Sequence, residues 1–145
     1  MIPPHTDRDF ELRKHRIWKV LAGTYGEVMQ ALDLRDARIR RLRFEVALPG
    51  YALATEATMV FVERWHQAGG EWRRVEYAFD YLLEPRGSGR RAHHFHDDIV
   101  HAHCEDPEAI HPHYRDVEVD LLEAAEDFAS YYLRGWVRCA GLFPL

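Results

Sequence analysis

The sequence has few cysteines and no long apolar run, and both absences limit what the protein can be. Its two cysteines, Cys104 and Cys139, are not spaced as a CxxC pair, so we expect free thiols in a reducing compartment. No stretch approaches the roughly 18 apolar residues of a membrane-spanning helix, and the first residues lack the apolar segment of a signal peptide. We therefore predict a cytoplasmic protein without a membrane segment.

The motifs of several common enzyme classes are also absent. The chain contains no GxGxxG, no P-loop and no GxSxG, so nothing supports a dinucleotide-binding enzyme, a P-loop NTPase or a Ser-His-Asp hydrolase. The formal net charge of −5 counts against a surface devoted to duplex nucleic acid, where basic footprints dominate. Arginine nevertheless outnumbers lysine and gathers in residues 35–43 and 86–91, where guanidinium forks suit phosphate or carboxylate.

The length and composition fit one globular domain. The chain has 145 residues, of which 47% are hydrophobic, and this is enough to bury a real core. We predict a single domain over residues 1–145. Thr6 or Asp7 can cap a first helix, and apolar residues at three- and four-residue spacing extend it to about Leu32.

Alternating apolar and polar residues predict an antiparallel sheet after this helix. Residues 41–48 alternate as in a half-buried strand, and residues 55–66 and 71–83 form two longer strands. Between them, Gly69-Gly70 favours a two-residue hairpin loop. That loop places Ala68 opposite Glu71, Val62 opposite Tyr77 and Val60 opposite Phe79. The apolar layer would then contain Val60, Val62, Val75, Tyr77, Phe79 and Tyr81, and the other face Met59, Phe61, Glu63, Trp65, Arg74, Glu76 and Asp80.

The C-terminal part of the chain predicts a helix and an apolar tail. Residues 116–134 combine an apolar stripe with an acidic face. Residues 136–145 include five large apolar side chains, so we expect this tail to dock on the domain or to join copies of the chain in a homo-oligomer. The elements together predict an α+β fold: an N-terminal helix, a twisted antiparallel sheet of four to five strands, and a C-terminal helix packed on one face.

The most unusual feature of the sequence is a histidine-rich segment. Seven of the ten histidines fall between residues 93 and 113. Imidazole titrates near neutrality and is the commonest metal ligand in proteins, so this density beside two aspartates is hard to explain by folding alone. If Asp97-Asp98 forms a hairpin turn, His94 faces His101. Strand alternation then places four imidazoles on one face, those of His94, His96, His101 and His103.

This arrangement supports two chemical interpretations. In the first, a catalytic set cleaves a phosphodiester by general acid–base chemistry, with two arginines holding the phosphate. The catalytic set is His94, His96, Asp97, Asp98 and His101, and the arginines are Arg90 and Arg91. In the second, His94, His96, His101 and His103 bind a divalent transition metal such as zinc. A solvated histidine-rich strand pair is the structural alternative, and a non-catalytic protein-interaction module is a further class of function.

The stretch from Glu76 to Phe128 resembles a known family. Its motifs are Glu76-Tyr77-Ala78-Phe79-Asp80-Tyr81, a glycine loop, Arg90-Arg91-Ala92-His93-His94-Phe95-His96, and Asp127-Phe128 in the last helix. They are similar to the strand pair, Gly-rich turn, HxH element and Asp-Phe pair of TumE-like toxins of toxin–antitoxin systems, although that family's Tyr-Asp-Asn element is missing. The resemblance implies a toxin that acts on RNA or translation and is held by a protein antitoxin. Together with the histidine segment, it makes a small ribonuclease the leading prediction.

Overall fold

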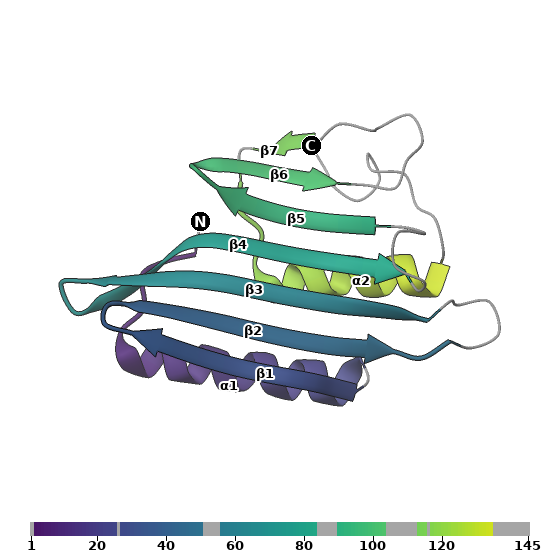
Figure 1. The fold of residues 1–145 in the computed structure, drawn as a ribbon, viewed down its shortest axis with the longest axis horizontal. Coiled ribbons are helices and arrows are strands. Elements are labelled where there is room, and N and C mark those ends of the chain that lie inside the picture. The colour runs from purple at the N-terminus through teal and green to yellow at the C-terminus, as the bar shows by residue number, and fades with distance from the viewer. Residues whose placement is uncertain are drawn as a thin grey trace.

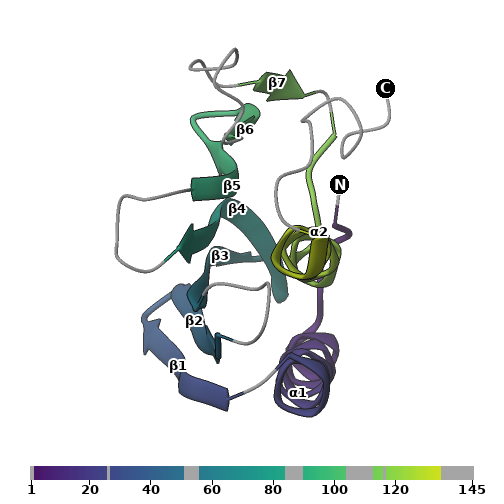
Figure 2. The ribbon, with the colours of Figure 1, turned by 90° about the vertical axis from the view of Figure 1, so that its right-hand side faces the viewer.

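The computed structural model has a twisted antiparallel sheet with both helices on one of its faces (Figures 1 and 2). It describes residues 2–25, 27–50, 56–83, 90–103, 113–115 and 117–134. The strands lie side by side in chain order as β1 (Glu27–Asp36), β2 (Ile39–Leu48), β3 (Ala57–Ala68), β4 (Glu71–Leu83), β5 (Arg90–His96), β6 (Ile99–His103) and β7 (His113–Arg115). The helices are α1 (Asp7–Thr24) and α2 (Leu121–Arg134).

The predicted α+β fold is confirmed, with one correction to the sheet. The N-terminal helix, the antiparallel sheet and the C-terminal helix are all present, but the sheet has seven strands rather than four or five. We call the face that carries the helices the inner face, and the opposite face the outer face. None of the helices in the described part of the chain is long and apolar enough to cross a membrane.

The first helix begins where the sequence predicts and ends earlier. Thr6 accepts a hydrogen bond from the backbone N–H of Asp9, and the Asp9 carboxylate accepts one from Thr6, which is a capping box. The predicted extension to Leu32 is wrong, because the helix ends at Thr24 and β1 follows. Val28 and Leu32 have helical spacing, but they pair with Val46 and Arg43 of β2, so their backbone groups are satisfied within the sheet.

The hairpin of β3 and β4 has the predicted loop but not the predicted register. Gly69 and Gly70 have φ values of 60° and 79°, as a two-residue hairpin loop requires, and Ala68 pairs with Glu71. Farther along, Trp65 pairs with Arg74 while Arg64 pairs with Glu76, so Val75 is an extra residue in β4. A β-bulge of this kind changes which side chains share a face.

Because of the bulge, the predicted assignment of β3 side chains to the two faces of the sheet is wrong. Val62 pairs with Ala78 and Val60 with Asp80, rather than with Tyr77 and Phe79. Val62 and Tyr77 therefore point to opposite faces of the sheet. The buried inner face of this hairpin consists of Ala57, Met59, Phe61, Glu63, Trp65, Trp72, Arg74, Tyr77, Phe79 and Tyr81. The strand over residues 41–48 is as predicted, since Leu42, Phe44, Val46 and Leu48 are all buried.

A buried ion network joins the two helices to the sheet. The Glu63 carboxylate accepts two hydrogen bonds of 2.6 Å from Arg13 of α1 and one of 2.9 Å from Arg74 of β4. Arg13 also donates to Asp120, the residue before α2, at 2.9 Å. Burial opposes ionisation of Glu63, but the two guanidinium groups outweigh it and lower the pKa of this carboxyl below its ordinary value.

The second helix covers the centre of the sheet and positions β5. It begins at Leu121 rather than at residue 116, and it ends at Arg134 as predicted. Its buried side chains are Leu121, Ala124, Ala125, Phe128 and Tyr131. Cys104, Cys139 and the apolar tail of residues 136–145 lie outside the described residues, so the predictions of free thiols and of oligomerisation through the tail are untested.

Candidate metal centre

The histidine segment folds into the predicted hairpin. Asp97 and Asp98 connect β5 to β6 with φ values of 51° and 60°, which are the positive angles of a type I′ turn. Aspartate tolerates this left-handed region better than most residues because its short side chain can hydrogen-bond locally. His94 pairs with His101, and His96 pairs with Ile99, so the register inferred from the Asp-Asp turn is confirmed.

Strand alternation brings four imidazoles together on the outer face. The ring centroids of His94 and His101 are 5.3 Å apart, and those of His94 and His103 are also 5.3 Å apart. The centroid distances from His101 to His96 and to His103 are 5.1 and 5.0 Å. His101 is buried at 8% exposure, whereas the side chain of His96 is 52% exposed. The cluster therefore has one buried member at its centre and one solvated member at its edge.

Three members of the cluster are close enough to share one metal ion. One ligand nitrogen from each of His94, His101 and His103 lies within 4.8 Å of the other two. Tetrahedral zinc with Zn–N bonds of about 2.0–2.1 Å holds its nitrogens roughly 3.3 Å apart. The three rings need to move together by about one ångström to reach that geometry, which rotation about the side-chain bonds can provide. His96 is not part of this group of three.

An acidic residue outside the predicted site orients the cluster. Nε2 of His94 lies 3.2 Å and 3.3 Å from the two carboxylate oxygens of Asp80 on β4. A metal bound to His94 would therefore use its other ring nitrogen, Nδ1. Carboxylates that hold the second nitrogen of a histidine ligand fix its tautomer and orientation. The sequence itself indicates this role, since Asp80 is an acidic residue among the aromatic side chains of a predicted strand.

The two turn aspartates do not hold the centre of the cluster. The Asp97 carboxylate lies 3.3 Å from Nδ1 of His96, and its side chain is 88% exposed. Asp98 is exposed at the tip of the turn. Both side chains lie at the solvated end of the hairpin, where a contact with His96 is weakly constrained. Asp97 therefore contacts the predicted site residue His96, whereas the carboxylate beside His94 is that of Asp80.

Arg91, one of the two predicted arginines, is not brought to the histidine cluster. Arg91 lies on the inner face, is fully buried, and donates from Nε to Asp127 of α2 at 2.7 Å. The same carboxylate oxygen lies 2.8 Å from Nε2 of His93. Alternation along β5 is the reason, because residues 91 and 93 point inward when His94 and His96 point outward. Arg90 pairs with Leu82 through the backbone, and its side chain lies outside the described part of the structure.

The contact among Arg91, His93 and Asp127 joins two segments that carry the family resemblance. Neither His93 nor Asp127 is among the site residues predicted from the sequence, although Asp127-Phe128 is one of the motifs that resemble TumE-like toxins. The three side chains are 0%, 4% and 11% exposed, and the His93 ring packs on Phe128 at 5.6 Å. Their position between β5 and α2 makes them a structural link that fixes the strand bearing the outer histidines.

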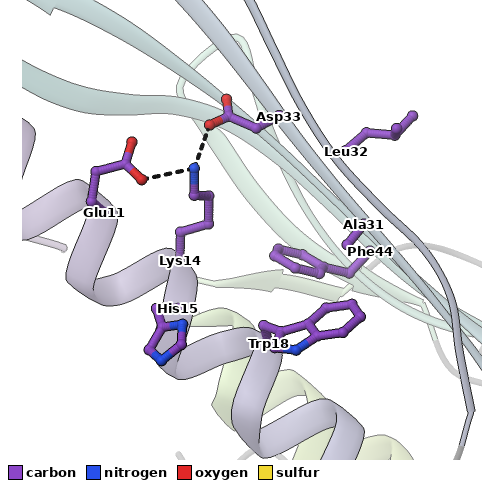
Figure 3. Close-up of a pocket in the computed structure, with 8 residues that line it drawn as sticks. All are labelled: Glu11, Lys14, His15, Trp18, Ala31, Leu32, Asp33 and Phe44. Carbon is purple, nitrogen blue, oxygen red and sulfur yellow. Dashed lines mark hydrogen bonds and ion pairs between the residues drawn. The ribbon is translucent and has the colours of Figure 1, made fainter.

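A separate cavity of about 340 Å³ lies between α1 and the first two strands (Figure 3). Trp18 and Phe44 line its apolar part. At its charged end, Nζ of Lys14 lies 2.8 Å from Glu11 and 2.7 Å from Asp33 (Figure 3). Arg40 pairs with both carboxylates as well, so the two cations neutralise the two anions, and the cavity contains no residue of the predicted site.

Comparisons with known proteins give no information on the function of this cluster, so its function is inferred from its geometry alone. No protein-family model matches the chain, and neither a curated protein nor a solved structure matches it. The resemblance to TumE-like toxins therefore stays a prediction. The RNA substrate and the protein antitoxin that it implies stay predictions as well.

Proposed function

We propose that the protein is a metal-dependent hydrolase whose metal, a divalent transition ion such as zinc, is bound by His94, His101 and His103. The observation that carries the proposal is the approach of three ligand nitrogens to within 4.8 Å of one another. Imidazole nitrogen is a preferred ligand of zinc and of several neighbouring first-row metals. Two adjacent strands supply the three ligands, so the sheet itself defines their spacing.

The number of ligands favours catalysis over a purely structural role. Structural zinc sites use four protein ligands, whereas catalytic sites use three and leave a position for water or substrate. The described residues offer three nitrogens in mutual reach, with Asp80 behind His94 as the orienting carboxylate. A metal bound there would lower the pKa of its water toward neutrality and supply a hydroxide nucleophile. The chain's own contribution is to fix the three rings and to orient His94.

Metal analysis of protein purified without a His tag tests the proposal. We expect about one zinc, or another first-row metal, per chain, and loss of that metal in His101→Ala. His15→Ala is the matched control, because His15 is an exposed histidine on α1 and should leave the metal content unchanged. Absence of metal from the wild type after incubation with zinc, nickel or iron would overturn the proposal.

A metal-free ribonuclease is the second candidate, and the contact of His94 with Asp80 favours it. A histidine held by a carboxylate is a common general base, and His101 at a centroid distance of 5.3 Å could act as the general acid. His96 lies on the same face beside His101. RNA cleavage that survives EDTA and is lost in His94→Ala would favour this function. Cleavage that EDTA abolishes and zinc restores would favour the metal-dependent one.

A further inference from the structure

We propose that a groove on the outer face, next to the histidine cluster, binds the oxyanion of a phosphate ester through Arg64, with Arg41 at its flank. The proposal rests on the proposed metal function, because the groove would present the ester to the metal centre. None of these residues belongs to the site predicted from the sequence. The groove adds a ligand class and a specificity-determining arginine to that site.

The groove is a consequence of a small side chain at the centre of the outer face. Val62, Ala78, His94 and His101 stand in one row across four strands, because Val62 pairs with Ala78, Ala78 with His94, and His94 with His101. Ala78 leaves a hollow between larger neighbours in this row. The resulting cavity measures about 210 Å³, and its lining includes Arg64, Glu76, Ala78, His94 and His96. The hollow therefore opens directly beside two members of the histidine cluster.

Arg64 has hydrogen-bonding capacity left for a ligand. Its closest ion-pair contact runs from Nη1 to Oε2 of Glu76 at 3.8 Å, which is too long for a hydrogen bond. Its Nε is buried and has no hydrogen-bond partner among the described residues, so a ligand would first meet the Nη groups of the fork. A guanidinium group carries five N–H donors in a planar fork that matches the oxygens of phosphate. A ligand oxyanion would satisfy donors that the contact with Glu76 leaves unused.

A second arginine lies directly across the strand pair. Arg41 of β2 is the cross-strand partner of Arg64, so their side chains share the outer face. Arg41 is exposed, and Arg64 is partly buried. Like charges in directly opposed positions destabilise a sheet, and Glu76 offsets only part of this repulsion at 3.8 Å. A bound anion would relieve it, which is an independent reason to expect an anion here.

Three other arginines of residues 35–43 already contact other groups. Arg40 is buried on the inner face, where its guanidinium pairs with Asp33 and Glu11. Arg35 lies over the Trp72 ring at 5.2 Å. Arg43 donates to the side chain of Gln30 at 2.9 Å. Arg41 and Arg64 thus form a cross-strand pair on the outer face, and Arg64 is the member that lines the groove.

The acidic groups of the groove make anion binding depend on the metal. Glu76 lines the groove, and Asp80 lies behind His94 on the same face. Their two negative charges balance those of Arg41 and Arg64, so the groove with neutral histidines has no net positive charge. A divalent ion on the histidines would add two positive charges beside it. We therefore expect phosphate to bind the zinc-loaded protein more tightly than the metal-free protein.

The test measures binding of inorganic phosphate to the full-length, zinc-loaded protein by calorimetry or by phosphorus NMR. Arg64→Gln should weaken phosphate binding roughly 10- to 100-fold, the range for loss of a charge-assisted contact, while the zinc content stays at the wild-type level. Arg64→Lys should recover part of the affinity, because it keeps the charge and loses the fork. Ala78→Leu should block the groove without changing any charge.

Arg16→Gln is the matched control, since Arg16 is an exposed arginine on α1 and should bind phosphate like the wild type. Zinc binding with phosphate affinity that is indifferent to Arg64→Gln and to Ala78→Leu would overturn the groove and leave the metal proposal standing. Absence of phosphate binding by the zinc-loaded wild type would also overturn the groove. If the protein binds no metal but binds phosphate through Arg64, the metal proposal fails and the groove is supported.

Discussion

His93 and His94 are neighbours in the chain, yet their imidazoles lie on opposite faces of the sheet and contact different carboxylates. Nε2 of His93 lies 2.8 Å from Asp127 of α2, whereas Nε2 of His94 lies 3.2 Å from Asp80 of β4. The His93 side chain is 4% exposed and packs on Phe128, while His94 belongs to the outer cluster. One strand therefore carries a structural histidine and a candidate metal ligand at consecutive positions.

Alanine substitutions at these two positions should have opposite consequences. His93→Ala removes a partner of a largely buried carboxylate and should lower the free energy of unfolding by about 1–3 kcal/mol, with little effect on zinc content. His94→Ala should abolish stoichiometric zinc and lower the metal-free unfolding free energy by less than His93→Ala does, because His94 and Asp80 are more exposed than His93 and Asp127. Urea denaturation and metal analysis of both variants check this. Equal loss of zinc in the two variants would contradict the division of roles.

Asp80 should matter for metal binding, and Asp98 should not. Asp80→Asn keeps the shape of the side chain but weakens its hold on His94, and loss of such an orienting partner typically lowers metal affinity 10- to 100-fold. Asp98→Asn changes the same chemical group at the exposed tip of the turn, so its zinc affinity should equal that of the wild type. Competition with a zinc-binding dye measures both affinities. A larger loss in Asp98→Asn would assign the orienting role to the turn.

The histidine hairpin could be predicted from the sequence because its determinants are local. Two adjacent aspartates define a two-residue turn, and period-two alternation then fixes which imidazoles share a face. The Gly69-Gly70 loop and the buried alternation of β2 were predictable for the same reason. The register beyond Arg64 was not, because one extra residue at Val75 reverses the alternation and nothing in the local sequence marks it.

The partners of the histidines depend on contacts between distant segments, which the sequence does not encode locally. Asp80 reaches His94 because β4 pairs with β5 in one register, and residues 84–89 separate these strands in the chain. Arg91 points away from the cluster because of the alternation of β5, which is local, but its partner Asp127 lies 36 residues later in the chain. Residues 27–32 were predicted as helix because their spacing fits both periods, and only pairing with β2 decides between them.

The Asp97-Asp98 turn should accept glycine at its second position with a gain in stability. Asp98 has a φ of 60°. This left-handed conformation costs a non-glycine residue up to about 1–2 kcal/mol of conformational free energy, whereas glycine adopts it without a steric cost. Because glycine also loses more entropy on folding, Asp98→Gly should raise the unfolding free energy by at most about 1 kcal/mol. Zinc binding should not change, since the Asp98 side chain is exposed at the tip of the turn and is not one of the three proposed ligands. A lower melting temperature would show that the Asp98 side chain makes a stabilising contact.

The buried Glu63 carboxylate should make the fold sensitive to acid. Arg13 and Arg74 lower the pKa of Glu63 below its ordinary value of 4.5, so its contribution is complete above that pH and is lost as the pH falls through the lower, folded pKa. Glu63→Gln leaves two buried guanidinium groups without their counter-charge and should lower the unfolding free energy by about 3–5 kcal/mol at pH 7. This difference in unfolding free energy from the wild type should shrink below pH 4.5, because the wild-type carboxyl also becomes neutral.

Glu71→Gln, at an exposed position beside the hairpin loop, is the control. Urea denaturation between pH 3 and pH 7 measures the difference, and a gap that stays constant over this range would show that Glu63 is not ionised in the folded protein.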